Sequence, residues 1–325
     1  MTKMNVLINT AAGLLTAVAL CGAAHGQEAY PVKPVKLVSG TAGGVQDVLA
    51  RVLAPELQKN LGQVVVVEPR PGAAGAISAE AVARAPADGY TFLLAVGAIT
   101  VLPALNKKLS FDVVKDFSAI TLLASAPNVF AVRADSPIKD LKDLIAEAKK
   151  KPGEITYATS GIGSTVHIGT EFLQSLTGIK LFHIPYNGSR PSVEALLGGQ
   201  VMSSMSSASV SQPLIKAGRL RAIGVTTQAR SVFLPEVPTF EELGVKGMRS
   251  DTWLGLMGPA NLPRNIAIRL NAELQQIMGK PDMKEKILNM GSEPVGLPLE
   301  KFAAQIKYEV ELFDKLVQSA GIKAE

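Results

Sequence analysis

The sequence is poor in the residues that carry most enzyme chemistry. Its 325 residues include one cysteine, three histidines and one tryptophan. It contains no G-x-G-x-x-G, no G-x-x-x-x-G-K-[ST], no G-x-S-x-G and no pair of histidines at metal-ligand spacing. These absences exclude the usual nucleotide-binding loops, the nucleophile turn of α/β hydrolases and cysteine-rich zinc sites. We therefore expect no catalytic residue, no metal and no cofactor.

Like charges do not gather in blocks along this chain. The formal net charge is +5, from 33 Lys and Arg against 28 Asp and Glu, and it is spread over the sequence. A diffuse positive excess suits the attraction of anionic solutes but does not predict nucleic-acid binding. With 47% hydrophobic and 19% charged residues, the chain has the composition of a soluble globular protein with one large core or two smaller ones.

The first residues read as a targeting segment. A lysine precedes the apolar run VLINTAAGLLTAVALCGAA and the small residues around Gly26. This pattern predicts a signal peptide over residues 1–26, cleaved near Gly26, and hence a periplasmic protein. An uncleaved anchor is the alternative, although the apolar core is short. A lipoprotein would need a small residue before Cys21, where Leu20 stands. Cleavage removes the only cysteine, so the mature protein must rest on its hydrophobic core.

Short apolar runs alternate with amphipathic helical patterns over most of the chain. Non-alternating runs rich in Val, Ile and Leu suit parallel strands that are covered on both faces. Their alternation with helices predicts a doubly wound α/β architecture. The strands are expected at 63–68, 90–96, 119–124, 129–132, 155–159, 181–186 and 220–225, and the helices at 45–60, 75–85, 138–150, 165–176 and 190–198.

From Pro263 onward, the sequence predicts helices only. One helix begins at Pro263, carries an apolar stripe and ends at Gly279. A second is expected over about 299–319, again with one apolar stripe. We expect these helices to return to an earlier domain and cover it.

Two glycine-rich turns, SGTAGG at 39–44 and SGIGST at 160–165, each lie between a predicted strand and a predicted helix. Such turns expose backbone N–H groups at the positive end of a helix, which suits phosphate or carboxylate. Two of them suggest two lobes that close on one anionic ligand. The alternative is that the glycines only make tight turns.

Three further side chains invite a structural or a functional interpretation. His183 lies in an apolar strand and is expected to be a hydrogen-bonded core histidine. His167 lies just inside a helix, where it could assist an anion site, but a local hydrogen bond is favoured. Trp253 could line a cleft, although a place in the core is favoured.

Eight segments, in order along the mature chain, carry a resemblance to one family. They are YPVKPVKLV (30–38), VVVVEPRPGAAG (64–75), AEAVARAPADGYTFLL (79–94), YATSGIGSTVHI (157–168), HIPYNGS (183–189), LLGGQV (196–201), IKAGRLRAIGVT (215–226) and LPEVPTFEELG (234–244). In these segments the sequence resembles the substrate-binding proteins of tripartite tricarboxylate transporters, also called Bug proteins.

The resemblance implies a Venus-flytrap receptor of two α/β lobes, each a doubly wound, mainly parallel sheet flanked by helices. It implies a discontinuous first lobe, 27–125 and 229–325, with the second lobe at 126–228. Such a receptor captures a small organic carboxylate and delivers it to membrane permease subunits. The resemblance implies neither catalysis nor nucleic-acid binding, and a freely diffusing receptor of this kind is expected to be a monomer.

The resemblance also places the ligand against loops of both lobes. The residues expected to bind it are Ser39, Gly40, Thr41, Ala42, Gly43, Val96, Gly97, Ser160, Gly163, Ser164, Thr165, Tyr186, Asn187, Arg190, Ser206 and Ser207.

Several positions depart from the family's pattern and bear on the ligand. Gly40 stands where the family usually has a phenylalanine, so we expect a roomier pocket. Ala95 and Val96 replace a polar pair, and Ile162 replaces a polar residue. Together these changes predict a more apolar cavity.

Two more departures concern charge. Ser206 stands where the family has an aspartate, and Arg190 where a small residue is more common. We therefore expect a dicarboxylate with an apolar body, such as an aromatic phthalate-type diacid, with Arg190 gripping one carboxylate. Arg190 could instead be a surface residue at a helix start, and Ser203 and Ser204 could belong to a strand packed against its neighbour.

Two other classes of function remain as alternatives. A ligand sensor that docks on a signalling partner would use the same site. An α/β enzyme could use the glycine turns for a phosphorylated substrate, although no base or nucleophile is evident.

Overall fold

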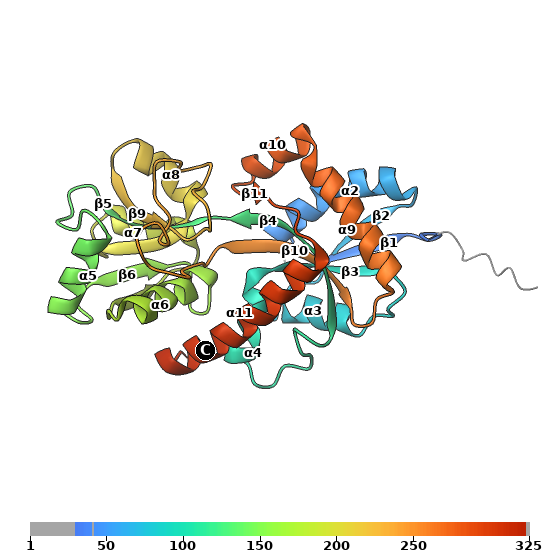
Figure 1. Ribbon diagram of the computed structural model, residues 1–325, viewed down its shortest axis with the longest axis horizontal. Helices are drawn as coiled ribbons and strands as arrows, with labels where there is room; N and C mark the ends of the chain where they lie inside the picture. Colours follow the sequence, from blue (N-terminus) through green and yellow to red (C-terminus); the bar gives the residue numbers. More distant parts are fainter. Residues whose placement is uncertain (1–29, 41, 323–325) are drawn as a thin grey trace, which may run out of the picture.

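A computed structural model describes residues 30–40 and 42–322 (Figure 1). The predicted signal peptide and Thr41 lie outside these residues. The described chain forms two lobes, each a β-sheet with helices packed on it, and two strands, β4 and β10, run between them (Figure 1). The two-lobed α/β fold expected from the sequence is thus confirmed.

The first lobe is built on a sheet with the strand order β11-β4-β10-β3-β1-β2. Its strands are β1 (Val35–Ser39), β2 (Val65–Pro69), β3 (Thr91–Val96), β4 (Phe117–Ala126), β10 (Thr252–Pro259) and β11 (Glu293–Pro294). Its helical segments are α2 (Val45–Leu61), η1 (Ala73–Gly75), α3 (Ala76–Ala83), η2 (Gly97–Thr100), α4 (Leu102–Leu105), α9 (Arg264–Gly279), α10 (Pro281–Asn289) and α11 (Leu299–Ala320).

The second lobe is built on a sheet with the strand order β7-β6-β8-β5-β9. Its strands are β5 (Asn128–Arg133), β6 (Thr156–Thr159), β7 (Phe182–Pro185), β8 (Ser203–Ser207) and β9 (Leu220–Val225). Its helices are α5 (Leu141–Lys150), α6 (Thr165–Thr177), α7 (Ser189–Leu197) and α8 (Ala208–Lys216).

Both sheets are mixed, which corrects the expectation of mainly parallel sheets. β1 pairs in parallel with β2 and β3, and β6 with β7 and β8. The strands that link the lobes, however, make antiparallel pairs. β4 continues through Pro127 into β5, and β10 brings the chain back beside β4 in the opposite direction. β5 is likewise antiparallel to both of its neighbours, β8 and β9.

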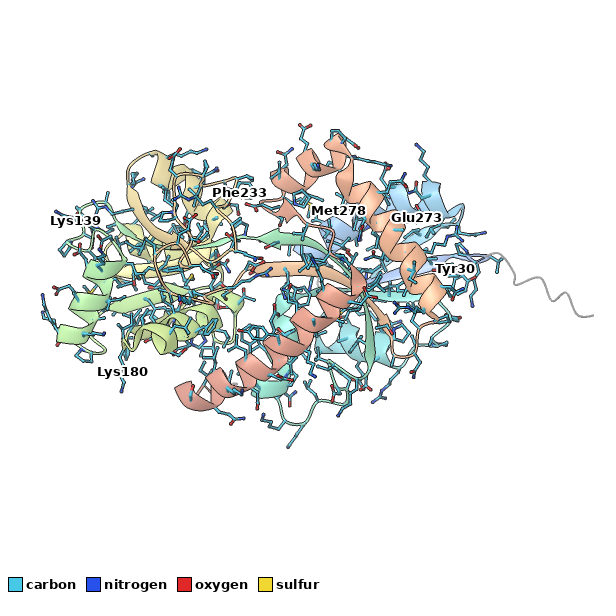
Figure 2. All side chains as sticks on the ribbon, in the orientation of Figure 1. Tyr30, Lys139, Lys180, Phe233, Glu273 and Met278 are labelled. Atoms are coloured by element: carbon cyan, nitrogen blue, oxygen red, sulfur yellow. The ribbon has the colours of Figure 1, made fainter. Side chains whose placement is uncertain are left out.

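The C-terminal helices cover the first sheet as expected. The apolar stripe of α9 is buried against α2, and Figure 2 labels two residues of this helix. Met278 lies in the core, while Glu273 accepts a hydrogen bond from Asn60 at 2.8 Å. The tail is not purely helical, because β11 pairs with β4. Trp253 is confirmed as a core residue, 1% exposed and edge-on to Phe302.

The hydrophobic contacts adjust the expected lobe boundary at 228/229. Phe240, Val245 and Met248 lie in the core of the second lobe, and Val225 bridges to Thr239. The segment before β10 therefore packs with the second sheet. The far end of α11 also reaches that core through Leu316. The remainder of the proposed lobe division stays a prediction.

Within residues 30–40 and 42–322, every helix is too short or too polar to cross a lipid bilayer.

Candidate functional site

The starts of several helices gather at one edge of each sheet. In the first lobe, α2, η1 and η2 follow the ends of the mutually parallel strands β1, β2 and β3. In the second lobe, α6, α7 and α8 follow the ends of the parallel strands β6, β7 and β8. In open α/β sheets, ligands bind outside these carboxyl ends, where helix N-termini offer free amide groups. The topology therefore predicts a ligand site between the lobes.

The first-lobe loop is held by a carboxylate inside the following helix. The N–H of Gly43 donates to Oδ2 of Asp47 at 3.0 Å, and the same oxygen accepts from Arg51 at 3.0 Å. These bonds, led by the one from Arg51, hold the pKa of Asp47 below its usual value. Gly44 caps α2 without a side-chain hydrogen bond. The side-chain acceptor at the start of this helix is therefore Asp47 and not the cap residue.

Ser39 lies at the bottom of this loop, fully buried at the end of β1. Its hydroxyl interacts with the carboxylate of Asp47 and contributes to the lowering of the pKa of that group. Ala42 and Gly43 are exposed at the top of the loop. The loop thus presents an exposed rim above the buried pair Ser39 and Asp47.

Gly40 does not open space in the pocket, which corrects our expectation of a larger guest at this position. A Cβ on Gly40 would lie 3.2 Å from Cα of Gly75 and 3.3 Å from Oγ of Ser78. These contacts are tighter than usual, so the backbone and Ser78 occupy the space beside Gly40.

Val96 and Gly97 form another wall of the first lobe. Val96 lines a narrow pocket with Gln46, Ser78 and Leu102, whose free volume of about 10 Å³ holds about one water molecule. Gly97 is buried, and a Cβ there would lie 3.2 Å from Nε1 of Trp253. This pocket alone is too small for an organic acid, so the ligand needs the space between the lobes.

The second-lobe loop is a tight turn that leads into α6. Gly161 and Gly163 have positive φ angles of 131° and 72°, which favour glycine. Ser164 caps the helix by accepting from the N–H of His167 at 3.3 Å and donates to the carbonyl of Gly161 at 2.7 Å. Ser160, Gly163, Ser164 and Thr165 are all partly exposed.

This loop lies against the first lobe and the crossover strand. A Cβ on Gly163 would lie 2.6 Å from Cδ1 of Leu105, which belongs to α4. The hydroxyl of Thr165 lies 2.5 Å from that of Thr252, the first residue of β10. The structure therefore brings the second-lobe loop next to the η2–α4 segment that follows Val96 and Gly97.

Tyr186, Asn187 and Arg190 lie at the start of α7. Tyr186 is partly buried, whereas Asn187 and Arg190 are exposed. Arg190 lines a pocket of about 480 Å³ between α7, α8 and Gly291 of the first lobe. None of the residues around this pocket also lines the pocket at Val96. Arg190 thus lines a pocket that reaches the first lobe, and this pocket is separate from the one at Val96.

Ser206 is not placed in an open cleft. It is fully buried and its hydroxyl pairs with that of Ser211 at 2.7 Å. Ser203 and Ser204 are also buried, as expected for a packed strand of small residues. Ser207 is partly exposed and its Oγ lies 2.9 Å from Oγ of Ser209. Of the two candidate serines, only Ser207 reaches the surface at the start of α8.

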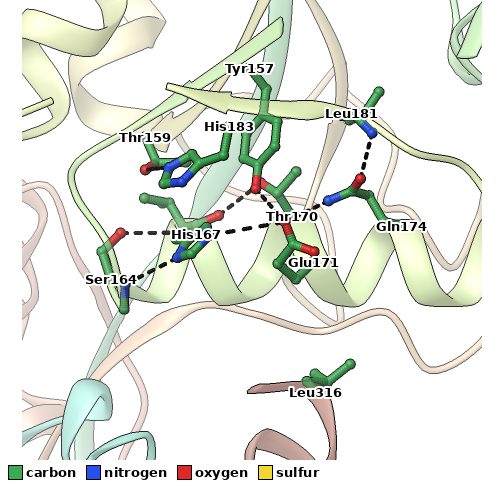
Figure 3. Close-up of polar contacts among 12 residues, drawn as sticks. Tyr157, Thr159, Ser164, His167, Thr170, Glu171, Gln174, Leu181, His183 and Leu316 are labelled. Atoms are coloured by element: carbon green, nitrogen blue, oxygen red, sulfur yellow. Dashed lines mark hydrogen bonds and ion pairs between the residues drawn. The ribbon is translucent and has the colours of Figure 1, made fainter. Parts of the chain in front are cut away.

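Two histidines lie behind the second-lobe loop (Figure 3). The rings of His167 and His183 stack with centroids 3.9 Å apart and an angle of 11°. Burial lowers the pKa of His167 to about 3, helped by His183, and burial lowers the pKa of His183 to about 4. Both are therefore neutral near pH 7. The local hydrogen bond expected for His167 is confirmed.

A partly buried acid behind the first-lobe wall was not singled out from the sequence. Glu309 of α11 accepts from Nε1 of Trp253 at 2.7 Å and lies 3.1 Å from the hydroxyl of Thr100. That hydroxyl also donates to the carbonyl of Gly97 at 2.7 Å. Burial raises the pKa of Glu309 to about 7, against the lowering effect of its hydrogen bonds. The sequence could have indicated it, because Glu309 follows Ile306 by three positions and so lies on the same helix face as the apolar stripe.

Within the described part of the chain, no group of three or more His, Cys, Asp or Glu residues is arranged to hold a metal ion.

A family model described as the tripartite tricarboxylate transporter family receptor matches residues 49–322. Among curated relatives, protein BugT of Bordetella pertussis is 32% identical over 326 residues, which cover 99% of each chain.

Three solved structures of similar fold differ in their bound ligand. Rpa4515 of R. palustris with adipate is 33% identical, with a TM-score of 0.71 and coverage of 90% of this chain and 99% of that one. MatC of Rhodopseudomonas palustris with bound malate is 27% identical, with a TM-score of 0.67 and coverage of 89% and 100%. A TctC solute-binding protein from Polaromonas without ligand is 28% identical, with a TM-score of 0.83 and coverage of 89% and 99%. With a family model that spans most of the chain and a relative matched from end to end, this protein belongs to the tripartite tricarboxylate transporter receptor family.

Proposed function

We propose that the protein is a periplasmic receptor that captures a small organic dicarboxylate between its lobes and hands it to the membrane subunits of a tripartite tricarboxylate-type transporter. The observation that carries this proposal is that α2, α6, α7 and α8 begin at the carboxyl ends of parallel strands of the two sheets, with the start of α6 lying against the first lobe. The predicted signal peptide supports the periplasmic location.

The chemistry of the site suits a carboxylate without any catalytic group. Helix starts provide amide donors and a positive field, and three of the four, α2, α7 and α8, lack a side-chain cap. A carboxylate held by several amides needs no cation to offset its charge. Closure of the lobes would exclude water and strengthen each hydrogen bond.

The relatives support both the ligand class and the closure. One is described with adipate and one with malate, which are both dicarboxylates. The ligand-free relative superposes better on this chain than either of these two does, although its sequence is no more similar than that of the adipate complex. We infer that the arrangement described here is the open, ligand-accepting one.

The apolar lining favours a diacid with an apolar body over a hydroxy acid or an amino acid. On the first lobe, Val96 at the end of β3 contributes an apolar side chain. On the second lobe, Ile162 in the glycine-rich turn contributes another and is 39% exposed. An aromatic, phthalate-type diacid remains part of the proposal, but it now rests on these two side chains because Gly40 is closely packed. Arg190 is the proposed cation for a second carboxylate, which lobe closure would have to bring nearer.

Calorimetric titration of the purified mature protein tests the proposal. Adipate, malate, phthalate, citrate and glutamate should be titrated separately under the same conditions. We expect binding of adipate or phthalate that is at least tenfold tighter than that of glutamate. Tight binding of glutamate or citrate with failure of both apolar diacids would contradict the proposed ligand class. Failure of all five acids would contradict the proposed function.

A further inference from the structure

The second-lobe loop is tied to two stacked histidines on neighbouring elements. His167 lies in the first turn of α6, and His183 lies in β7 (Figure 3). The ring of Tyr157 stacks on that of His183 with centroids 4.9 Å apart, so the three rings form one continuous stack. His167 is only 4% exposed. This burial leaves the pair few ways to hydrogen-bond except to the loop and to its immediate neighbours.

The first tie runs from Gly163 to His167. The N–H of Gly163 donates to Nδ1 of His167 at 3.1 Å. Nδ1 can accept only when it carries no proton, so the neutral ring must carry its proton on Nε2. That nitrogen lies 4.0 Å from Oε1 of Glu171, which also accepts from Tyr157 at 2.5 Å and from Gln174 at 2.7 Å. The surroundings thus favour the tautomer that can hold the Gly163 amide.

The second tie runs from Gly161 to His183 through a hydroxyl. The N–H of Gly161 donates to Oγ1 of Thr159 at 3.3 Å, and this Oγ1 lies 2.6 Å from Nε2 of His183. Either atom can be the donor of this short bond, because the threonine hydroxyl can instead donate to the carbonyl of Gly161 at 3.4 Å. The Gly163 amide therefore bonds to an imidazole directly, and the Gly161 amide is connected to the second imidazole through the hydroxyl of Thr159.

We propose that His167 and His183 are positioning residues for ligand capture: as a stacked, neutral pair they hold the amides of Gly161 and Gly163, and thereby the loop that receives a carboxylate. This inference rests on the proposed function for the identity of the ligand. These bonds set the orientation of the Ser160–Gly161 and Ile162–Gly163 peptide groups. A loop with free amide orientation would have to lose that freedom on binding, which lowers affinity.

The same geometry makes the loop sensitive to acid. A protonated imidazole has two donors and no acceptor, so a charged His167 would release the amide of Gly163. A charged His183 would donate to Oγ1 of Thr159, which can still accept from Gly161. Two charged rings at 3.9 Å would also repel each other. Among residues 30–40 and 42–322, the titratable side chains that face the pair are those of Tyr157 and Glu171, of which Glu171 is an acid. Because burial lowers the pKa of His167 to about 3, its bond to Gly163 should hold at neutral pH and be lost only as the pH falls toward about 3.

Three substitutions of His167 separate positioning from simple packing. His167→Asn places an amide oxygen near the position of Nδ1, whereas His167→Gln places its amide near Nε2, and His167→Phe keeps a ring without an acceptor. We expect adipate affinity near that of the wild type for His167→Asn. For the other two we expect a loss of about tenfold, which is the scale of one hydrogen bond. Equal losses in all three variants would overturn the inference.

Two readouts do not depend on the ligand. Amide hydrogen exchange of residues 159–165 should be faster than in the wild type for His167→Gln and His167→Phe, but not for His167→Asn. The ¹⁵N spectrum of the wild type at pH 7 should show an unprotonated Nδ1 on His167, and a protonated Nδ1 would overturn the inference even if no variant folds. If the wild type binds no diacid while these two readouts come out as expected, the proposed function fails and the positioning of the loop stands.

Discussion

Replacing Glu309 by glutamine should remove part of the pH dependence of stability. In the folded protein, burial raises the pKa of this carboxyl from 4.5 to about 7. The unfolded chain therefore loses this proton near pH 4.5, while the folded chain keeps it to about pH 7. Between these values the folded state binds more protons, so the free energy of unfolding falls as pH rises through the window. Above about pH 7 this contribution stays constant.

The size of the effect follows from the shift. The difference between 4.5 and about 7 corresponds to about 3 kcal/mol at full strength. Glu309→Gln keeps an oxygen that can accept from Trp253 and Thr100 at the position of Oε2, and it cannot ionise. Its NH2 group takes the position of Oε1, where it can donate to Gln305 once the side-chain amide of Gln305 turns over. We expect wild type and variant to be equally stable near pH 4.5, and the variant to be more stable by about 2–3 kcal/mol at pH 8.

Urea unfolding at pH 5, 6, 7 and 8 measures this difference. Comparison at each pH cancels the opposite trend from the two histidines, whose lowered pKa values make stability fall as pH drops below about 6.5. Glu311→Gln, at an exposed position of the same helix, controls for the loss of one charge. A difference between Glu309→Gln and wild type that stays constant from pH 5 to 8 would refute the reasoning.

Two further substitutions test the binding surfaces. Gly163→Ala should weaken adipate binding about tenfold or more, because its Cβ would meet Leu105 at 2.6 Å and push the loop from the first lobe. Gly153→Ala is the control, since its φ of 80° imposes similar strain of about 1 kcal/mol with open space around the Cβ; equal effects of the two on binding would contradict the interlobe contact. Arg190→Ala should weaken adipate more than hexanoate in calorimetry, and equal losses would exclude Arg190 from gripping a second carboxylate.

The helices and most strands were predictable because their signals are local. α2 was expected at 45–60 and is found at Val45–Leu61, where Gly62 ends it in the left-handed region. β8 was harder, since SSMSS carries no β-branched residue. It is a strand because it pairs with β5 and β6, and because Ser203 finds an acceptor in the carbonyl of Thr156. Such long-range pairing leaves no local trace in the sequence.

The position of the two glycine-rich turns was also predictable, but the contacts that support them were not. Glycines after a strand mark a turn, and both turns lie where the strands end. The packing of Gly40 on Gly75 joins loops that are 35 positions apart in the sequence. The histidine stack depends on the parallel register that sets Tyr157 opposite His183. These contacts join segments that are distant in the sequence, so they cannot be predicted from any one segment.

The most direct test of the account is a pair of calorimetric titrations, one with adipate and one with its uncharged diamide. The account holds that helix-end amides capture negative carboxylates between the lobes. It predicts that adipate binds and that the diamide, which has the same length and apolar body, does not bind measurably at the same concentrations. Equal binding of the two compounds, or binding of the diamide alone, would contradict it.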